Sequence, residues 1–245
     1  MALNAKKVKA VGKKGVEQEA MEPGSYPARL VQVIDLGVQT QRPYEGQAKP
    51  PIQEVMLTYE FLDEFMKDED GEDIEDKPRW LSETIPLHNL AADLAKSTKR
   101  YKALDPDEVH EGDFTALVGT ACVVTIVNNK GKGQNAGKVY TNIAGVSTMR
   151  PKEAAKAPEL INEPKVFDLG DPDLTIFKSL PDWLQEKIKG NLEYEGSALQ
   201  EALEDAPEDE EEKPKGKPAG KKKRAVEEPE EAEDEGDENE GDEPW

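Results

Sequence analysis

The pattern of apolar residues between positions 26 and 146 constrains the fold more than any other feature of this chain. Val55, Leu57, Tyr59 and Phe61 alternate with polar side chains, the two-residue period of a half-buried β-strand. Similar β-rich stretches occupy 26–36, 79–87, 120–127 and 139–146, and Gly119 separates a further short strand from 120–127. These stretches predict a mostly β fold.

A helical pattern interrupts the strands between the third and fourth stretches. His88-Asn89 offers a cap, Leu90 and Leu94 repeat at a spacing of four, and basic residues follow at Lys99 and Arg100. The order is three strands, a helix and two strands, which is the arrangement of the OB-fold. We therefore predict an all-β, five-stranded OB-fold-like barrel over residues 22–150, with its helix between strands three and four.

The segment after the barrel divides into a linker and a short helix within residues 151–203. Four prolines between 151 and 175 favour an extended linker. Ser179 and Pro181 then predict a helix start, with Leu180, Trp183, Leu184 and Ile188 on one apolar stripe and Gly190 at the end. We expect this helix to dock either on its own barrel or on a second subunit, as in a homodimer.

The two ends of the chain carry opposite charges. Residues 1–21 form a lysine-rich arm, interpreted either as a frayed terminus or as a contact for nucleic-acid phosphates. The chain has a net charge of −21, and residues 225–245 hold twelve acids and no base. That composition predicts a disordered acidic tail over 204–245. The tail ends in Asp242-Glu243-Pro244-Trp245, a compact aromatic and anionic ligand for a basic apolar pocket on a partner protein.

No sequence motif indicates catalysis, a metal or a cofactor. Phosphate loops, nucleophile elbows and paired cysteines are missing, so we expect a protein that is not an enzyme. Cys122 lies in an apolar run and is interpreted as a buried side chain, and His88 as a capping or surface residue. The acidic stretch 63–76 fits a solvated loop better than a calcium site. With no long apolar segment, we expect a cytoplasmic protein without membrane contact.

Aromatic and basic residues on the predicted strands and loops suggest contact with a nucleic-acid strand, because aromatic faces stack on bases and cations follow phosphates. OB-folds bind with strands two and three and the loops joining strands one–two and four–five. The candidate DNA-binding residues are Tyr26, Arg29, Arg42, Tyr44, Tyr59, Arg79, Trp80, Lys99, Arg100, Tyr101, Lys130, Lys132, Lys138 and Tyr140. Tyr59 and Phe61 share a face with Val55 and Leu57 and so have a core interpretation as well. Trp80 fits either role.

Several blocks of the chain resemble bacteriophage single-stranded-DNA-binding proteins. They are GSYPARLV at 24–31, the strand at 55–61, WLSE at 80–83 and LPDWL at 180–184, together with the acidic tail. The resemblance implies an OB-fold that coats single-stranded DNA during phage replication, recombination or repair in an infected bacterium. It also implies a tail that recruits a polymerase, helicase or nuclease and competes with DNA. The terminal tryptophan departs from the usual phenylalanine. The alternative is an acidic interaction module or DNA mimic that binds basic proteins.

Overall fold

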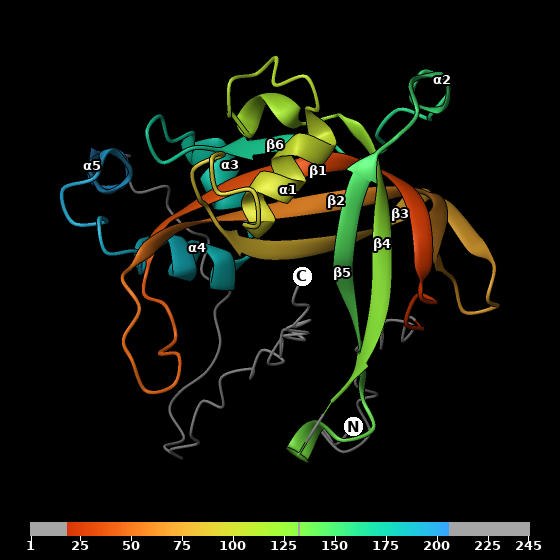
Figure 1. Ribbon diagram of the computed structural model, residues 1–245, viewed down its shortest axis with the longest axis horizontal. Coiled ribbons are helices and arrows are strands. Elements are labelled where there is room, and N and C mark those ends of the chain that lie inside the picture. Colours follow the sequence, from red (N-terminus) through yellow and green to blue (C-terminus); the bar gives the residue numbers. More distant parts are fainter. Residues whose placement is uncertain (1–18, 132, 206–245) are drawn as a thin grey trace, which may run out of the picture.

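The computed structural model describes residues 19–131 and 133–205 and is mostly β (Figure 1). Most of the basic arm, Lys132 and the acidic tail with Asp242, Glu243, Pro244 and Trp245 lie outside the described residues. The strands are β1 (Gly24–Gln39), β2 (Ile52–Lys67), β3 (Asp73–Pro86), β4 (Ala121–Lys130), β5 (Val139–Thr148) and β6 (Lys165–Phe167). The α-helices are α1 (Lys96–Leu104), α2 (Pro151–Ala154), α3 (Leu174–Ser179), α4 (Asp182–Lys189) and α5 (Ala198–Asp205).

Five strands form an antiparallel sheet in the order β3-β2-β1-β4-β5, and β6 adds to β1 in parallel. β1 is central because it pairs with β2 along much of its length and with β4 near its start. Its register with β2 shifts between Asp35 and Gly37. Gly37 has a φ of 71°, and a Cβ there would lie 2.6 Å from the Asn191 side chain, so this bulge requires glycine.

The main core lies on one face of the sheet. Val55, Leu57, Tyr59 and Phe61 of β2 all point into it, which confirms the predicted alternation. The prediction of a half-buried strand was wrong, however, because Met56, Thr58 and Glu60 on the opposite face are buried as well. β2 is therefore enclosed on both sides.

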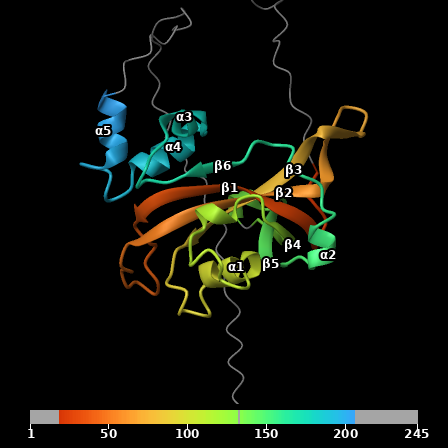
Figure 2. The same cartoon turned by 90° about the horizontal axis from the view of Figure 1, so that it is seen from above.

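A second apolar cluster covers the opposite face of β1 and β2. Ile34, Leu36 and Met56 pack there with side chains from β6, helices α3 to α5 and the turn between α3 and α4, namely Phe167, Phe177, Leu180, Leu184, Ile188 and Leu199. Figure 2 shows α1 on one side of the sheet and α3 to α5 on the other. The segment predicted as a linker thus contains a strand, and its following helices dock on their own sheet.

Two residues that face each other across β1 and β2 hold residues 157–162, the start of the covering C-terminal segment, on the sheet. Arg29 of β1 lies opposite Glu60 of β2. The Arg29 guanidinium donates to the carbonyl oxygens of Ala157 and Pro158 at 3.0 and 2.7 Å. The Glu60 carboxylate accepts from the backbone N–H groups of Ile161 and Asn162 at 2.7 and 3.1 Å. Because Glu60 is buried, these hydrogen bonds stabilise its charge and hold the segment on the sheet.

Three local predictions differ from the structure. The helix begins at Lys96 rather than Asn89, since the Asn89 side chain accepts from the N–H of Ala91 and turns the chain before it. The short strand expected before Gly119 is instead a 3-10 turn at Thr115–Leu117, initiated by Asp113, which accepts from the N–H of Thr115. Ser179 ends α3, and α4 starts after Pro181.

Helix α1 fills the space between β3 and β5. It contacts both strands, and the Thr148 hydroxyl donates to the carbonyl of Ala103 at 2.8 Å. Among the described residues, no hydrogen-bonded ladder joins β3 to β5. None of the described helices combines the length and apolar character needed to cross a bilayer.

Candidate functional site

Three of the candidate DNA-binding residues are buried and have no face to offer a base or phosphate. Tyr59 lies in the main core, where burial raises the pKa of its hydroxyl well above the usual value. The Tyr101 ring packs edge-on against Phe114, and its hydroxyl donates to Asp105 at 2.9 Å. Arg100 is also buried. The interpretation of these three as contact residues was wrong. The rings of Tyr59 and Tyr101 pack inside the protein, and Arg100 forms an ion pair with the buried Glu83 carboxylate.

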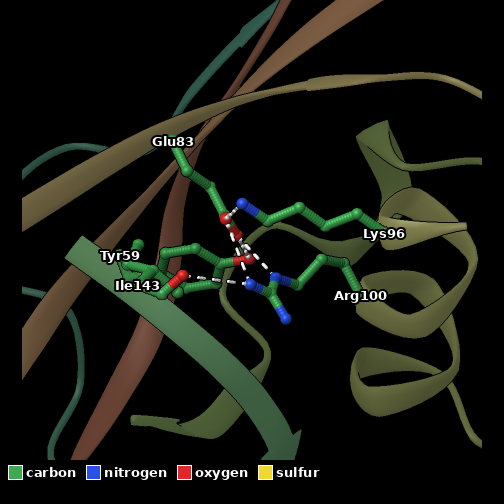
Figure 3. A network of polar contacts seen from close by, with 5 residues as sticks. All are labelled: Tyr59, Glu83, Lys96, Arg100 and Ile143. Atoms are coloured by element: carbon green, nitrogen blue, oxygen red, sulfur yellow. Dashed lines mark hydrogen bonds and ion pairs between the residues drawn. The ribbon is translucent and has the colours of Figure 1, made fainter. Parts of the chain in front are cut away.

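Arg100 belongs to a polar network that connects α1 to β3 and β5 (Figure 3). Its Nε lies 2.7 Å from Oε1 of Glu83 on β3, and its Nη2 lies 3.5 Å from the carbonyl of Ile143 on β5. The Tyr59 hydroxyl donates to Glu83 at 3.3 Å, and the Lys96 ammonium lies 3.2 Å from the same carboxylate. The network holds the helix in place rather than forming a binding surface.

Intrachain hydrogen bonds also occupy three candidates on β1 and β3. Arg29 donates to three backbone carbonyls, including that of Gly119 at 2.7 Å. The Tyr26 hydroxyl donates to the carbonyl of Glu22, and its ring packs edge-on against Phe61. Arg79 donates to the carbonyl of Glu19 at 2.7 Å. These contacts place the three side chains in structural roles.

The exposed face of β3 gives the clearest candidate surface. Trp80 is 51% exposed, and Ser82 and Thr84 are exposed on the same face of the strand. Trp80 lies opposite Glu60, so this face is the one that α3 to α5 cover over β1 and β2. The covering layer packs on β1 and β2 and leaves these three residues of β3 open.

A basic hollow lies at the end of this strip. It encloses about 530 Å³ and is lined by Gln39, Thr40, Gln41, Arg42, Lys49, Glu54, Pro86 and Lys187. Arg42 and Lys49 come from the loop between β1 and β2. Tyr44 in that loop is 54% exposed, and the Lys49 ammonium lies 4.9 Å from the centre of its ring. Aromatic and cationic groups therefore meet where the β3 face ends.

Lys187 is the cation of this hollow that the sequence analysis missed. It reaches the hollow from α4, and its ammonium lies 2.9 Å from the Glu54 carboxylate of β2. The only signal in the sequence was its place one helical turn after Trp183. That spacing could not show which strand the helix lies beside. We name the outer face of β3 at Trp80, Ser82 and Thr84, together with the basic hollow, the β3 surface.

The remaining candidates lie apart from the β3 surface. Lys130, Lys138 and Tyr140 lie on the β4–β5 hairpin, which projects from the sheet on the same side as loop 40–51 in Figure 1. Tyr140 pairs with Asn129, and the Lys138 ammonium donates to Asn135 at 3.2 Å. Lys99 is exposed on α1, on the opposite side of the sheet from α4 (Figure 2).

The acidic connection between β2 and β3 is a tight turn. Asp68 accepts from the N–H groups of Asp70 and Glu72 through its side chain. Within residues 19–131 and 133–205, no three acidic, histidine or cysteine side chains gather in a way that would hold a metal ion.

Comparison with protein-family models gives no match, and comparison with curated protein sequences gives none either.

Proposed function

We propose that this chain is a non-catalytic protein that binds single-stranded DNA across the β3 surface of an OB-fold-like barrel. The strand order and the position of α1 between β3 and β5 support the barrel assignment. The observation that carries the proposal is the exposed Trp80 on a polar strand face that leads into a hollow with Arg42, Lys49 and Lys187.

The chemistry of this surface suits a single strand. An exposed tryptophan can stack on any base, which contributes about 1–3 kcal/mol per base and requires no particular sequence. The cations of the hollow can contact phosphates, and Ser82 and Thr84 can hydrogen-bond to either sugar or phosphate oxygens. In a duplex the bases are already stacked on each other and their faces are unavailable to Trp80. The surface therefore favours unpaired strands.

The acidic tail has two roles in this proposal. Residues 225–245 carry twelve acids without a base and would compete with DNA for the cations of the hollow. When DNA displaces the tail, its end at Trp245 becomes available to a replication or recombination protein such as a polymerase, helicase or nuclease. A chain ending at Val226 should accordingly bind DNA more tightly at low salt, and equal or weaker binding would contradict the competition.

Tryptophan fluorescence tests the binding proposal directly. The full chain with Trp183→Phe and Trp245→Phe retains only Trp80, so quenching by oligo-dT reports on β3 itself. We expect quenching that weakens as salt rises, because phosphate contacts release counterions. Arg42→Gln/Lys49→Gln should weaken binding, whereas the charge-matched control Lys152→Gln/Lys156→Gln, in and just after α2, should not.

Absence of quenching and of binding at low salt would overturn the proposal. The acidic interaction module would then be the better interpretation, and the exposed acids of the β2–β3 turn would be its first surface to test against basic proteins.

A further inference from the structure

We propose that helix α4 forms part of the DNA-binding surface, with Trp183 as a second base-stacking residue and Lys187 as a phosphate contact. This inference rests on the proposed function and extends it from the barrel to the C-terminal segment. It gives α4 a role beyond covering the sheet.

The geometry of α4 places both side chains on one flank. Leu184 and Ile188 are buried against the sheet and define the inward face of the helix. At 100° per residue, Lys187 lies about 80° and Trp183 about 120° from the centre of that face, both on the same side of the helix and one turn apart. Lys187 brings this flank to the basic hollow, since it lines the hollow and its backbone carbonyl accepts from the Gln39 side chain at 3.2 Å. Trp183 lies beside the hollow, one helical turn away from Lys187.

Exposure of Trp183 supports a ligand rather than a packing role. Its side chain is 59% exposed on a helix that is otherwise well anchored. The apolar stripe predicted from sequence included Trp183, yet Leu180, Leu184 and Ile188 make the buried contacts without it. An exposed indole beside a lysine is the pairing that binds a base together with its phosphate.

The distance between Trp80 and Lys187 suits a short nucleic-acid strand. Glu60, opposite Trp80, and Glu54, in contact with Lys187, are six residues apart on β2. At 3.3 Å per residue the separation is about 20 Å. A strand that runs from Trp80 over Ser82 and Thr84 into the hollow would span about four nucleotides, at the lower limit of OB-fold site sizes.

Glu54 provides a sensitive check on this path. Its carboxylate now neutralises Lys187 at 2.9 Å, and a phosphate in the hollow would compete for the same ammonium. Glu54→Gln should therefore tighten binding, since it removes both the competing partner and a repulsive charge. Lys187→Gln should weaken binding and reduce the slope of log affinity against log salt by about one.

The experiment compares two single-tryptophan versions of the full chain. One retains Trp80 (Trp183→Phe/Trp245→Phe) and the other retains Trp183 (Trp80→Phe/Trp245→Phe), and both are titrated with oligo-dT at two salt concentrations. We expect quenching in both versions. In an otherwise native chain, Trp183→Ala should weaken binding about 5- to 150-fold, the range for a stacked base. Circular dichroism melts confirm that each variant is folded.

The outcomes separate the two proposals. If Trp80 is quenched while Trp183 is not, and Lys187→Gln binds like the Lys152→Gln/Lys156→Gln control, the role of α4 is refuted and DNA binding stands. If neither tryptophan responds and no DNA is bound, the proposed function itself is refuted. Quenching of both, with weaker binding in Lys187→Gln and tighter binding in Glu54→Gln, supports the inference.

Discussion

The ion pair between Arg100 and Glu83 should make the two partners unequally costly to remove. Their side chains are only 4% and 7% exposed, and the nearest atoms are 2.7 Å apart. Breaking such a buried pair from one side costs about 3–5 kcal/mol, since the remaining charge lies in a poorly solvated site. Which end of that range applies depends on the contacts that the remaining partner keeps.

Arg100→Met leaves Glu83 with two other partners, the Lys96 ammonium at 3.2 Å and the Tyr59 hydroxyl at 3.3 Å. We therefore expect a loss of about 3 kcal/mol. Glu83→Leu removes the carboxylate that pairs with the buried Arg100 guanidinium. Of the contacts in this network, the guanidinium then keeps the one to the Ile143 carbonyl, at 3.5 Å. That variant should lose about 4–5 kcal/mol.

The double variant Glu83→Leu/Arg100→Met should be less destabilised than Glu83→Leu alone, because no unpaired charge is buried and Lys96 can turn to water. Urea denaturation followed by circular dichroism measures all three free energies of unfolding. Equal losses for the two single variants, or a double variant that shows their sum, would refute the electrostatic reasoning. Arg100→Met should also bind oligo-dT like the unmodified chain wherever it is folded.

Three further predictions concern the C-terminal segment, the thiol and acid stability. A chain ending at residue 150 should aggregate and bind a hydrophobic dye, because it lacks the helices that cover Ile34, Leu36 and Met56. A chain ending at residue 205 keeps these helices and should do neither. Burial raises the pKa of the Cys122 thiol to about 12, so a thiol reagent at pH 8 should react only as the protein unfolds, and rapid labelling of the folded chain would contradict this. Hydrogen bonds from the N–H groups of Ile176 and Thr175 hold the pKa of the Asp173 carboxyl below its ordinary 3.8. The ionised carboxylate therefore stabilises α3 fully above pH 3.8, and this stabilisation is lost as the pH falls through the lowered pKa. Asp173→Asn keeps the helix cap and should flatten the fall in melting temperature below about pH 4, and an unchanged slope would assign the acid sensitivity elsewhere.

Sequence patterns predicted the regular parts of the fold well. The alternation of Val55 to Phe61 placed the core face of β2, and turn residues separated five strands at about their observed positions. The extra strand β6 was missed because a strand of only three residues, Lys165–Phe167, carries too little periodicity to indicate pairing. The helix start was misplaced because Asn89, read as a cap, forms a local turn instead.

The sequence predicted the candidate site less well than the fold, because aromatic and basic side chains can pack inside a protein as readily as they bind a ligand. Several candidates remain accessible, among them Arg42, Tyr44, Trp80 and the hairpin residues Lys130, Lys138 and Tyr140. Tyr59 and Tyr101, in contrast, are buried in the core. A Tyr on a strand has the same local signature in both roles. Burial depends on which segment, distant in the chain, packs against that face.

The sequence by itself determined the strand periodicity, the position of α1 in the element order and the charge contrast between the ends, because each follows from neighbouring residues. Only the tertiary structure decided that residues 157–205 cover β1 and β2, that Arg29 and Glu60 fasten this layer, and that Lys187 joins Arg42 and Lys49 at one hollow. These contacts join residues more than a hundred positions apart, and their energies come from desolvated charge and buried apolar area, which exist only once the segments meet.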